Sequence, residues 1–594
     1  MKNFSITILV FLCAVANVSH SQIFLDDSYS DWDSITPACS DAIGDNNDNV
    51  IDFKNLFITD NAEYLFLKVE VGSEIILQED NELTIYLDTD NNNSTGLSVK
   101  GIGAEIKFIF GDRSGVFYSG GDEQAISHSD IGLISSPSHS SNMFEMAINK
   151  STEINGKKIF NNNSIGIVIK AKNTGGDEVP DGNGGILYLF QNNSVGVPAD
   201  YSIKKINNGH LRILSYNVSR DMLFASGKTE RYEKIISTIN PDIIGFGEIY
   251  NHTSGETADL ISGFLPEGNW YHAKMGYDLV AVSRFPITSS FPINAIDDNQ
   301  GCGAFLLDLR PKYESKLLMI IAHPKCCGGE ENNIRRQRQI DAIMAFIRDA
   351  KDEGGILTLD NNTPIVICGD MNLVGYADQI NTLINGNILY ESDYGPDFIP
   401  DWDNSGFDDS KPYVTNLPFT FTWRDDESGY SPGRLDFIFY SGSVMNKVNS
   451  YNLFTESLPN DSLNYYGFSE DDVTEASDHL PVVADFGLSH VTGIGMTGSI
   501  HSPEKFILYQ NYPNPFNPNT VISFQSSVFS KIQIRIYDLL GREIAELLND
   551  YKEPGVYEVE FDGASVKDGL NSGIYFCELR AGVHSSVRKM IALK

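Results

Sequence analysis

Eight polar side chains in the middle of the chain stand where apolar runs begin or end. Runs of this composition are typical of buried β-strands, which hold the side chains at their ends in fixed positions. Carboxylate, amide and imidazole groups held in this way can bind a divalent cation and transfer protons. The following residues therefore form one candidate site: Asn217, Glu248, His323, Asp370, Asn372, Asp436, Asp478 and His479.

The spacing within this set indicates its chemistry. Asp370 and Asn372 follow the apolar run 364–368 and are two residues apart, so they point to one side of an extended chain. Asp478 and His479 are adjacent, and a histidine oriented by a carboxylate suits a general base. Each signal alone is weak, because a strand-end Asn is commonly a turn residue and a lone His is commonly structural.

Strand-like and helix-like segments alternate through this part of the chain. The pattern predicts strands at 211–218, 242–249, 317–322 and 364–368, and helices at 229–240 and 332–351. Alternation of this kind predicts an α/β domain with helices outside a sheet core.

The order Asn, Glu, His, Asp-x-Asn, Asp and Asp-His resembles that of the endonuclease/exonuclease/phosphatase superfamily, which includes deoxyribonuclease-I-like nucleases and bacterial sphingomyelinases. The most specific strings are GDMN at 369–372 and SDHLP at 477–481, and the resemblance covers residues 208–488. It implies a four-layer α/β/β/α sandwich with its active site at one edge of the paired sheets.

The resemblance also implies a metal site. Glu248, with Asn217, would hold Mg²⁺ or Mn²⁺, and oxygen ligands of this kind suit such hard cations. Asp478 would hold the site together or join a second metal ion.

The remaining roles that the resemblance implies concern proton transfer. Asp436 would orient His479, which would take a proton from water. Asp370 would place or activate that water, Asn372 would contact the phosphate or the nucleophile, and His323 would donate a hydrogen bond or a proton to the phosphate. Which of His479 and Asp370 is the formal base stays open.

The chain departs from the superfamily pattern at residues 323–329, His-Pro-Lys-Cys-Cys-Gly-Gly. The proline and the paired cysteines suggest a rigid or disulfide-tied loop beside the site, with Cys302 bridged to Cys326 or Cys327 as one arrangement. This departure concerns the substrate more than the chemistry.

Residues 1–21 have the pattern of a secretory signal peptide, and residues 22–206 read as an all-β sandwich, followed by a short hinge at 207–209. The sandwich resembles carbohydrate-binding, family-nine-like modules, which implies a glycan as a partner. Its loop 88–96 offers Asp88, Asp90 and Asn92 as Ca²⁺ ligands, with a solvated Asn/Asp turn as the equally weighted alternative.

Residues 489–503 read as a linker, and residues 504–594 as a small all-β sandwich. The string NYPNPFNP at 511–518 and the segments that follow it resemble the type A sorting domain of the type IX secretion system in Bacteroidetes. This implies export by that machinery, then secretion or attachment to the outer cell surface. No further segment is apolar and long enough for a transmembrane span.

Three functions compete. A secreted, Mg²⁺-dependent nuclease acting on extracellular nucleic acid ranks first, although the net charge of −37 provides no general basic surface for phosphates. A sphingomyelinase-like or other phosphodiesterase or phosphatase ranks second, and would need an exposed aromatic loop from residues 402–423 to contact lipid. A surface glycan-binding protein with an inactive hydrolase domain is the hypothesis of another class.

Overall fold

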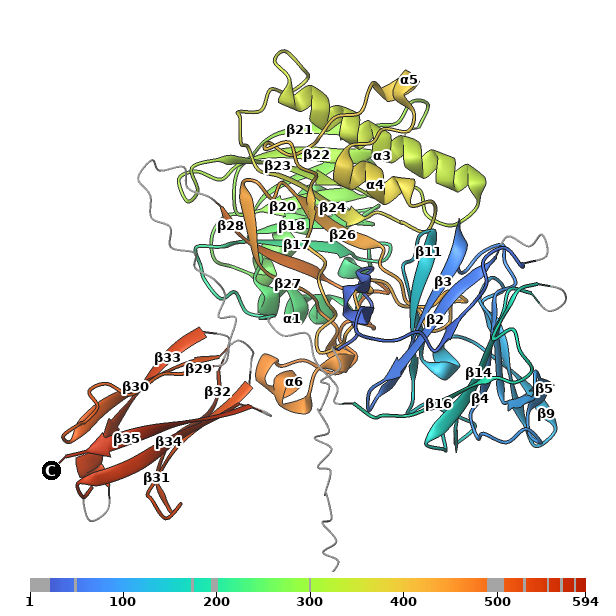
Figure 1. Ribbon diagram of the computed structural model, residues 1–594. Helices are drawn as coiled ribbons and strands as arrows, with labels where there is room; N and C mark the ends of the chain where they lie inside the picture. The colour runs from blue at the N-terminus through green and yellow to red at the C-terminus, as the bar shows by residue number, and fades with distance from the viewer. Residues whose placement is uncertain are drawn as a thin grey trace, which may run out of the picture.

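The computed structural model describes residues 22–593, apart from 47–50, 173–175, 194–200, 299–300, 489–506, 527–529, 553–554, 567–569 and 582–583. The expected signal peptide and linker lie outside the described residues. Figure 1 shows three parts along the chain, a β-rich part at the N-terminus, a central α/β part and a β-rich part at the C-terminus. This agrees with the multidomain architecture expected from the sequence.

The N-terminal part is a sandwich of two antiparallel sheets whose inner faces share one apolar core. The first sheet has the order β1-β2-β3-β11-β10, with bounds Cys39–Ser40, Phe53–Asp60, Tyr64–Ile75, Ser141–Asn149 and Leu133–Ser136. The second has the order β15-β14-β4-β7-β8-β9, with bounds Glu178–Val179, Ser164–Lys170, Thr84–Asp88, Ile106–Ile109, Ser114–Ser119 and Asp122–Ile126. The strand β16 (Ile186–Leu189) pairs with β14, while β5 (Leu97–Val99) and β6 (Ile102–Ala104) form a small separate sheet.

The central part contains two six-stranded sheets packed face to face. One has the order β19-β20-β18-β17-β28-β27, with bounds Tyr271–Met275, Leu279–Ser283, Ile243–Gly247, Leu211–Asn217, Val482–Leu488 and Met445–Asn452. The other has the order β21-β22-β23-β24-β26-β25, with bounds Ile287–Ile293, Cys302–Asp308, Lys316–Ile321, Ile365–Asp370, Asp436–Tyr440 and Asp408–Asp409.

Helices cover the outer faces of both central sheets. The helices α1 (Thr229–Ile239) and α2 (Ser254–Phe264) pack on the first sheet, and α3 (Glu330–Lys351) and α4 (Asp378–Asn385) pack on the second. The short helices α5 (Glu391–Tyr394) and α6 (Asn460–Tyr466) lie in later connections. The order of layers is therefore α/β/β/α, as expected (Figure 1).

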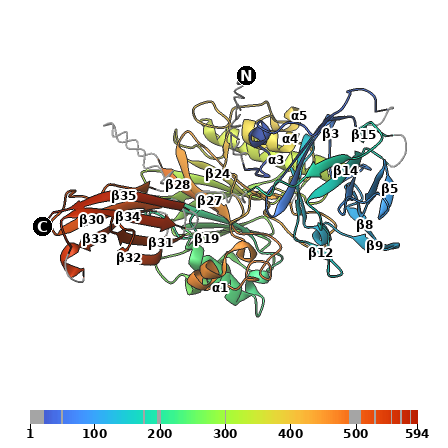
Figure 2. The ribbon, with the colours of Figure 1, turned by 60° about the horizontal axis from the view of Figure 1, so that its bottom comes forward.

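The C-terminal part is a second, smaller sandwich with a three-stranded and a four-stranded sheet. Their orders are β29-β30-β33 and β32-β31-β34-β35, with bounds Ile507–Leu508, Asn519–Ser526, Gly555–Asp562, Glu543–Lys552, Ser530–Tyr537, Gly573–Ala581 and His584–Ala592. In Figures 1 and 2 these strands lie on the opposite side of the central part from the N-terminal sandwich. Within the described residues, the structure contains no helix with the length and apolarity needed to cross a bilayer.

The N-terminal sandwich shares a core with the central part. Leu25 and Phe419 form a β-bridge, and both side chains are almost completely buried. The ring of Tyr64, at the start of β3, meets the ring of Phe419 edge-on, with 5.0 Å between the centroids. These residues belong to the same apolar cluster as Tyr216 of β17. The two parts therefore pack as one body, and the sandwich is more than a tethered module.

Residues 201–206, at the end of the segment that joins the two parts, are also held in place. The fully buried guanidinium of Arg212 donates to the carbonyl oxygen of Ile203 at 2.6 Å and to the two carboxylate oxygens of Asp485 at 2.6 and 2.7 Å. The hydroxyl of Tyr451 donates to the same Ile203 carbonyl at 2.9 Å. The joining segment is therefore anchored directly before the expected hinge at 207–209.

Replacing Phe419 by Ala should lower the free energy of unfolding by about 3–5 kcal/mol, because the change leaves a cavity in the shared core. Urea denaturation followed by tryptophan fluorescence measures this, since Trp32 lies in the shared core and Trp423 in the central part. The matched control Leu187→Ala removes a side chain that is 59% exposed and should change stability by less than about 0.5 kcal/mol. Separate unfolding of the sandwich and the central part would contradict a shared core.

Candidate active site

Strand alternation brings the site residues to one edge of the paired sheets. Successive side chains of a strand point to opposite faces, and in β17 Ile213 faces the second sheet. Asn217 has the same parity as Ile213, and His323, Asp370 and Asp436 have the parity of the residues of β23, β24 and β26 that lie between the sheets. The pairs β17–β18 and β23–β24 are parallel, so their carboxyl ends lie at a common edge.

The imidazole of His479 is held by Asp436. The Nδ1 atom of His479 lies 2.7 Å from Oδ2 of Asp436, and both residues are buried. The carboxylate therefore favours the tautomer with a proton on Nδ1 and leaves Nε2 facing the other site residues. The hydroxyl of Thr422 accepts a hydrogen bond from the backbone NH of Asp436 at 2.8 Å, which fixes the start of β26.

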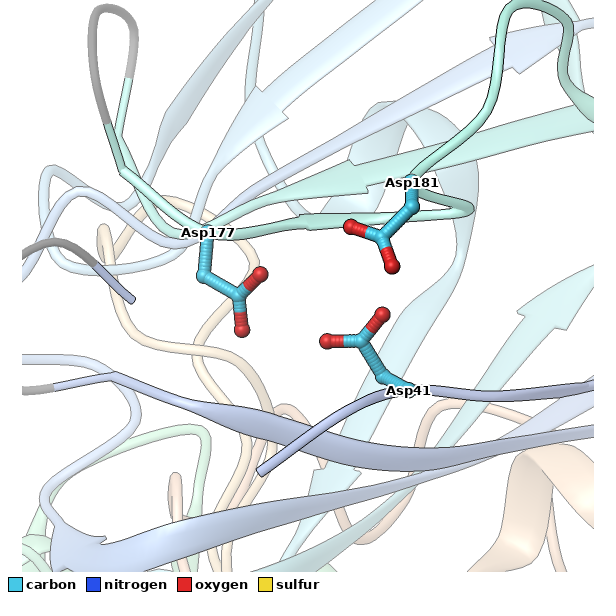
Figure 3. Close-up of side chains that lie close together, drawn as sticks. All are labelled: Asp41, Asp177 and Asp181. Carbon is cyan, nitrogen blue, oxygen red and sulfur yellow. The ribbon is translucent and has the colours of Figure 1, made fainter. Parts of the chain in front are cut away.

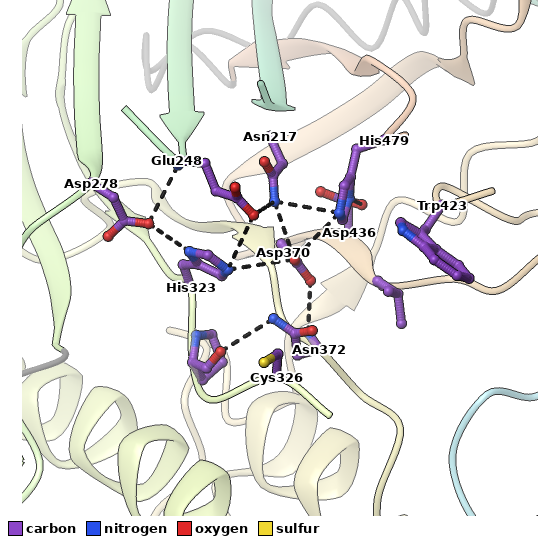
Figure 4. Close-up of polar contacts among 12 residues, drawn as sticks. Asn217, Glu248, Asp278, His323, Cys326, Asp370, Asn372, Trp423, Asp436 and His479 are labelled. Carbon is purple, nitrogen blue, oxygen red and sulfur yellow. Dashed lines mark hydrogen bonds and ion pairs between the residues drawn. The ribbon is translucent and has the colours of Figure 1, made fainter. Parts of the chain in front are cut away.

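Asn217 and Asp370 connect the two sheets at this edge (Figure 4). The Nδ2 atom of Asn217 donates to Oε1 of Glu248 at 3.0 Å and to Oδ2 of Asp370 at 3.3 Å. The same Asp370 oxygen lies 3.7 Å from Nε2 of His479 and 3.7 Å from Nε2 of His323. The two carboxylates and the two imidazoles therefore converge on one point.

A second carboxylate–imidazole pair includes a residue that the sequence did not single out. The Nδ1 atom of His323 lies 2.6 Å from Oδ2 of Asp278, directly before β20, and the same carboxylate accepts from the backbone NH of Glu248 at 3.3 Å (Figure 4). The sequence offered one signal for Asp278, its position directly before the apolar run 279–283. That signal is weak, because loops commonly contain an aspartate.

The GDMN string forms a tight turn after β24. Gly369 has φ of +129°, and an added Cβ would lie 2.1 Å from the carbonyl oxygen of Ala322, so only glycine fits there. The backbone NH of Asn372 donates to Oδ1 of Asp370 at 3.0 Å, and its side chain donates to the carbonyl of Pro324 at 3.2 Å. The turn thus joins β24 to the loop that begins at His323.

Asp478 lines the cavity together with five other site residues, Glu248, His323, Asp370, Asn372 and His479. One oxygen of its carboxylate accepts a hydrogen bond from the indole Nε1 of Trp423 at 3.2 Å. Ser477 donates to the carbonyl of Asn217 at 2.9 Å, which ties the SDHLP string to the end of β17. The structure therefore brings all eight predicted residues together.

The charges of this site shift three pKa values. Burial lowers the pKa of His479, but the charges of Asp436 and Asp370 outweigh burial and raise it to about 10. Burial also lowers the pKa of His323, and the hydrogen bond with Asp278 and the charge of Asp370 raise it to about 9. Burial raises the pKa of Asp370 to about 6, against the positive charge of His479. The surrounding carboxylates therefore favour the protonated form of both imidazoles.

The loop of residues 323–329 is held by an arginine and contains no disulfide. Among the described cysteines all thiols are free, so the bridge from Cys302 to Cys326 or Cys327 is absent. Cys302 is buried in the core under α3, and burial raises the pKa of its thiol to about 12. The fully buried Arg336 instead donates to the carbonyl oxygens of Lys325 and Cys327 at 2.6 and 3.1 Å.

The donor set fits a hard divalent cation. Glu248 and Asp370 direct carboxylate oxygens to the same amide group of Asn217, at the wall of the cavity. Mg²⁺ and Mn²⁺ prefer such oxygen ligands. The Asn217 amide directs its nitrogen to these two carboxylates, and its oxygen accepts a hydrogen bond from the backbone NH of Ser219 at 3.1 Å. A rotation of the amide by about 180° would offer its oxygen as a further ligand.

Acidic groups also gather in the N-terminal sandwich. Asp88, Asp90 and Glu105 place carboxylate oxygens within 4.8 Å of one another, so Glu105 joins two of the predicted Ca²⁺ ligands. The third, Asn92, instead accepts from the backbone NH of Ser94 at 3.1 Å. Figure 3 shows a separate group of three carboxylates, those of Asp41, Asp177 and Asp181. Acidic side chains alone do not identify a cation site, and Ca²⁺ binding stays a prediction.

Two family models match the chain. Residues 214–479 match the Endonuclease/Exonuclease/phosphatase family, across the four-layer part that contains the site. This part is an endonuclease/exonuclease/phosphatase domain. Members of this family are hydrolases that act on phosphoester bonds. Residues 510–593 match the Secretion system C-terminal sorting domain, so the protein is secreted and attached to the cell surface.

Several solved structures are similar to the chain, while no curated protein matches it. TDP2 from C. elegans is 16% identical, covering 47% of this chain and 75% of its own, with a TM-score of 0.29. An endonuclease/exonuclease/phosphatase from Beutenbergia cavernae is 12% identical, covering 64% and 100%, with a TM-score of 0.30. An AP endonuclease from Archaeoglobus fulgidus is 13% identical, covering 47% and 100%, with a TM-score of 0.30. Likenesses at these TM-scores carry no argument about activity.

Replacing Asp278 by Asn should lower kcat/KM for phosphoester hydrolysis about 10–100-fold, because the amide no longer fixes the tautomer and charge of His323. Steady-state hydrolysis of bis(4-nitrophenyl) phosphate measures this. The matched control is Asp308→Asn. Asp308 forms a surface ion pair with Arg310, so this change should leave kcat/KM unchanged. An unchanged rate for the Asp278 variant would show that this carboxylate does not act through His323.

Proposed function

We propose that the central domain is a divalent-metal-dependent phosphoester hydrolase that acts outside the cell. The observation that carries this proposal is the convergence of two buried carboxylate–imidazole pairs, His479–Asp436 and His323–Asp278, on Asp370. This arrangement can bind a phosphoryl group and move a proton beside it. The intact set of acidic and imidazole groups speaks against the hypothesis of an inactive hydrolase domain.

In the proposed mechanism His479 takes the proton of the attacking water. Its Nε2 atom faces the cavity, while Asp436 holds Nδ1. His479 must be neutral for this step. A divalent cation at Glu248 and Asp370 would offset the carboxylate charge that raises the pKa of His479, and would thereby lower that pKa. Asp370, at 3.7 Å from Nε2 of His479, is placed to orient the water.

His323 serves the phosphoryl group in this mechanism. Its Nε2 atom lies 3.7 Å from Oδ2 of Asp370 and 4.0 Å from Oε1 of Glu248, and the hydrogen bond between its Nδ1 atom and Asp278 favours its protonated form. It can therefore donate a charge-assisted hydrogen bond to a phosphoryl oxygen. A divalent cation held by Glu248 and Asp370, with Asn217, would neutralise negative charge on the phosphoryl group and its leaving oxygen.

Nucleic acid is the first substrate that the sequence suggests, and a lipid or small phosphodiester is the second. A lipid substrate would need exposed aromatic side chains between residues 402 and 423, but Phe407, Phe419 and Phe421 are buried in the core. Of the described aromatic side chains in this segment, that of Trp423 lines the cavity. The structure thus gives little support to a membrane-contact loop from this segment.

Replacing His479 by Ala should lower kcat about 10²–10⁴-fold, because general-base catalysis is lost. Hydrolysis of bis(4-nitrophenyl) phosphate with Mg²⁺ measures this, and EDTA should abolish the wild-type rate until Mg²⁺ is restored. The control His272→Ala changes an exposed histidine that contacts Ser254 and should keep full activity. Turnover that survives both EDTA and the His479 substitution would overturn the proposal.

Replacing Glu248 by Gln should weaken binding of Mn²⁺ by about tenfold or more, because a charged oxygen ligand is lost. Titration calorimetry, or the loss of the electron paramagnetic resonance signal of free Mn²⁺, measures this independently of turnover. Glu256→Gln is a suitable control, because Glu256 caps α2 and lies outside the cavity. Equal affinities for the wild type and the Glu248 variant would place the metal elsewhere.

A further inference from the structure

The N-terminal sandwich contributes side chains to the active-site cavity. The cavity has a volume of about 500 Å³ and contains Glu248, His323, Asp370 and His479 in its lining. The lining also includes Ile76, Gln78, Glu79 and Ser138, all from the sandwich. This volume suits a small organic molecule.

Three of these residues belong to the connection between β3 and β4, residues 76–83, which we call the wall loop. The side chain of Asn81 holds it in one shape, donating to the carbonyl oxygens of Ile76, Leu77 and Glu79 at 2.8, 2.8 and 2.9 Å. The Oδ1 atom of Asn81 accepts from the backbone NH of Leu83 at 3.0 Å. The wall loop is therefore braced internally.

On one side the wall loop is bonded to the central domain next to Trp423. The hydroxyl of Tyr430 donates to Oε1 of Glu79 at 3.0 Å, and the backbone NH of Ser431 donates to Oε1 of Gln78 at 2.9 Å. Arg113 of the sandwich donates to the carbonyl of Gln78 at 2.7 Å and lies over the Tyr430 ring, 4.3 Å from its centroid.

On the other side the wall loop touches the loop of residues 323–329. A Cβ atom added to Gly328 would lie 1.6 Å from Oε1 of Glu79, so the two loops are in direct contact. Ser138 of the sandwich donates to the carbonyls of Leu373 and Arg434 at 2.9 and 3.1 Å, next to Asn372 and near Asp436. The sandwich thus contacts the loop of residues 323–329 through Glu79, and the turn that follows β24 through Ser138.

The charge of the lining disfavours a polyanion. Among the described residues that line the cavity, Arg220 is the one arginine or lysine. Together with the imidazoles of His323 and His479 it faces four carboxylates, those of Glu79, Glu248, Asp370 and Asp478. A nucleic-acid backbone or an inositol polyphosphate would need several such cations. Apolar and aromatic side chains make up much of the remaining lining, namely Ile76, Tyr250, Val374, Trp423, Tyr430 and Leu435.

We propose that the wall loop is a specificity-determining part of the active site, and that it restricts the substrate to small phosphoesters with a single phosphate and an apolar or aromatic group. The inference rests on the proposed phosphoester hydrolysis and names its substrate class. Ile76 contacts the apolar group, and the Glu79 carboxylate repels additional phosphates. The same repulsion disfavours an internal phosphodiester of a duplex, because further phosphates flank it on both sides.

The test uses the full-length protein with Mg²⁺ and three substrates, bis(4-nitrophenyl) phosphate, covalently closed plasmid DNA and inositol hexakisphosphate. The wild type should hydrolyse the aryl ester and leave the other two intact. Ile76→Trp narrows the cavity and should raise KM for the aryl ester roughly tenfold or more, with kcat kept within about threefold. The matched control Leu187→Trp, at an exposed position of the same sandwich, should change neither constant.

Glu79→Gln supplies a second variant that retains an acceptor for Tyr430. It should strengthen inhibition by inositol hexakisphosphate about threefold or more, because one repulsive charge is removed. Nicking of plasmid by the wild type, or an unchanged KM for Ile76→Trp, would overturn the wall-loop inference while leaving the hydrolase in place. If no ester turned over, the proposed function would fail, and calorimetric affinities of both Trp variants for the aryl ester would still test the wall loop.

Discussion

Burial of the two central sheets against each other is the constraint on which the site depends. Strands β17, β23, β24 and β26 are buried on both faces, so polar side chains within them are costly unless they are paired, as Arg212 is with Asp485. Parallel pairing within each sheet then brings the ends that carry Asn217, Glu248, His323 and Asp370 to a common edge. The chemistry is concentrated there because most of the other side chains of these strands are apolar and pack in the core.

Charges at this edge are tolerated because they are paired. Asp436 with His479, and Asp278 with His323, place an acidic and a basic group within hydrogen-bonding distance in a buried setting. Removing one member would leave the other uncompensated, and burial makes that costly. The pairing fixes the orientation of each imidazole and leaves both Nε2 atoms facing Asp370. The interactions that make the edge stable are therefore the ones that prepare it for proton transfer.

The shared core around Phe419 changes how the domain organisation is understood. A sandwich that packs through Leu25 and Tyr64 against the central domain holds a constant position relative to the site. A short connection such as the wall loop can then line the cavity, because its two anchoring loops are fixed as well. The sorting domain has a core of its own and lies away from the site, in accord with a role in export.

The sequence by itself determined the fold class and the sorting tail, and it predicted the eight residues that the structure brings together, because strand periodicity and short motifs are local properties of the chain. It could not identify Asp278, which precedes β20 and resembles any loop aspartate until His323 is placed beside it. Nor could it show that Arg336 is buried, that Cys302 is unpaired, or that Glu79 reaches the cavity. Only the tertiary structure decided these features, because each depends on contacts between segments far apart in the chain. Local patterns carry no information about which distant surfaces meet.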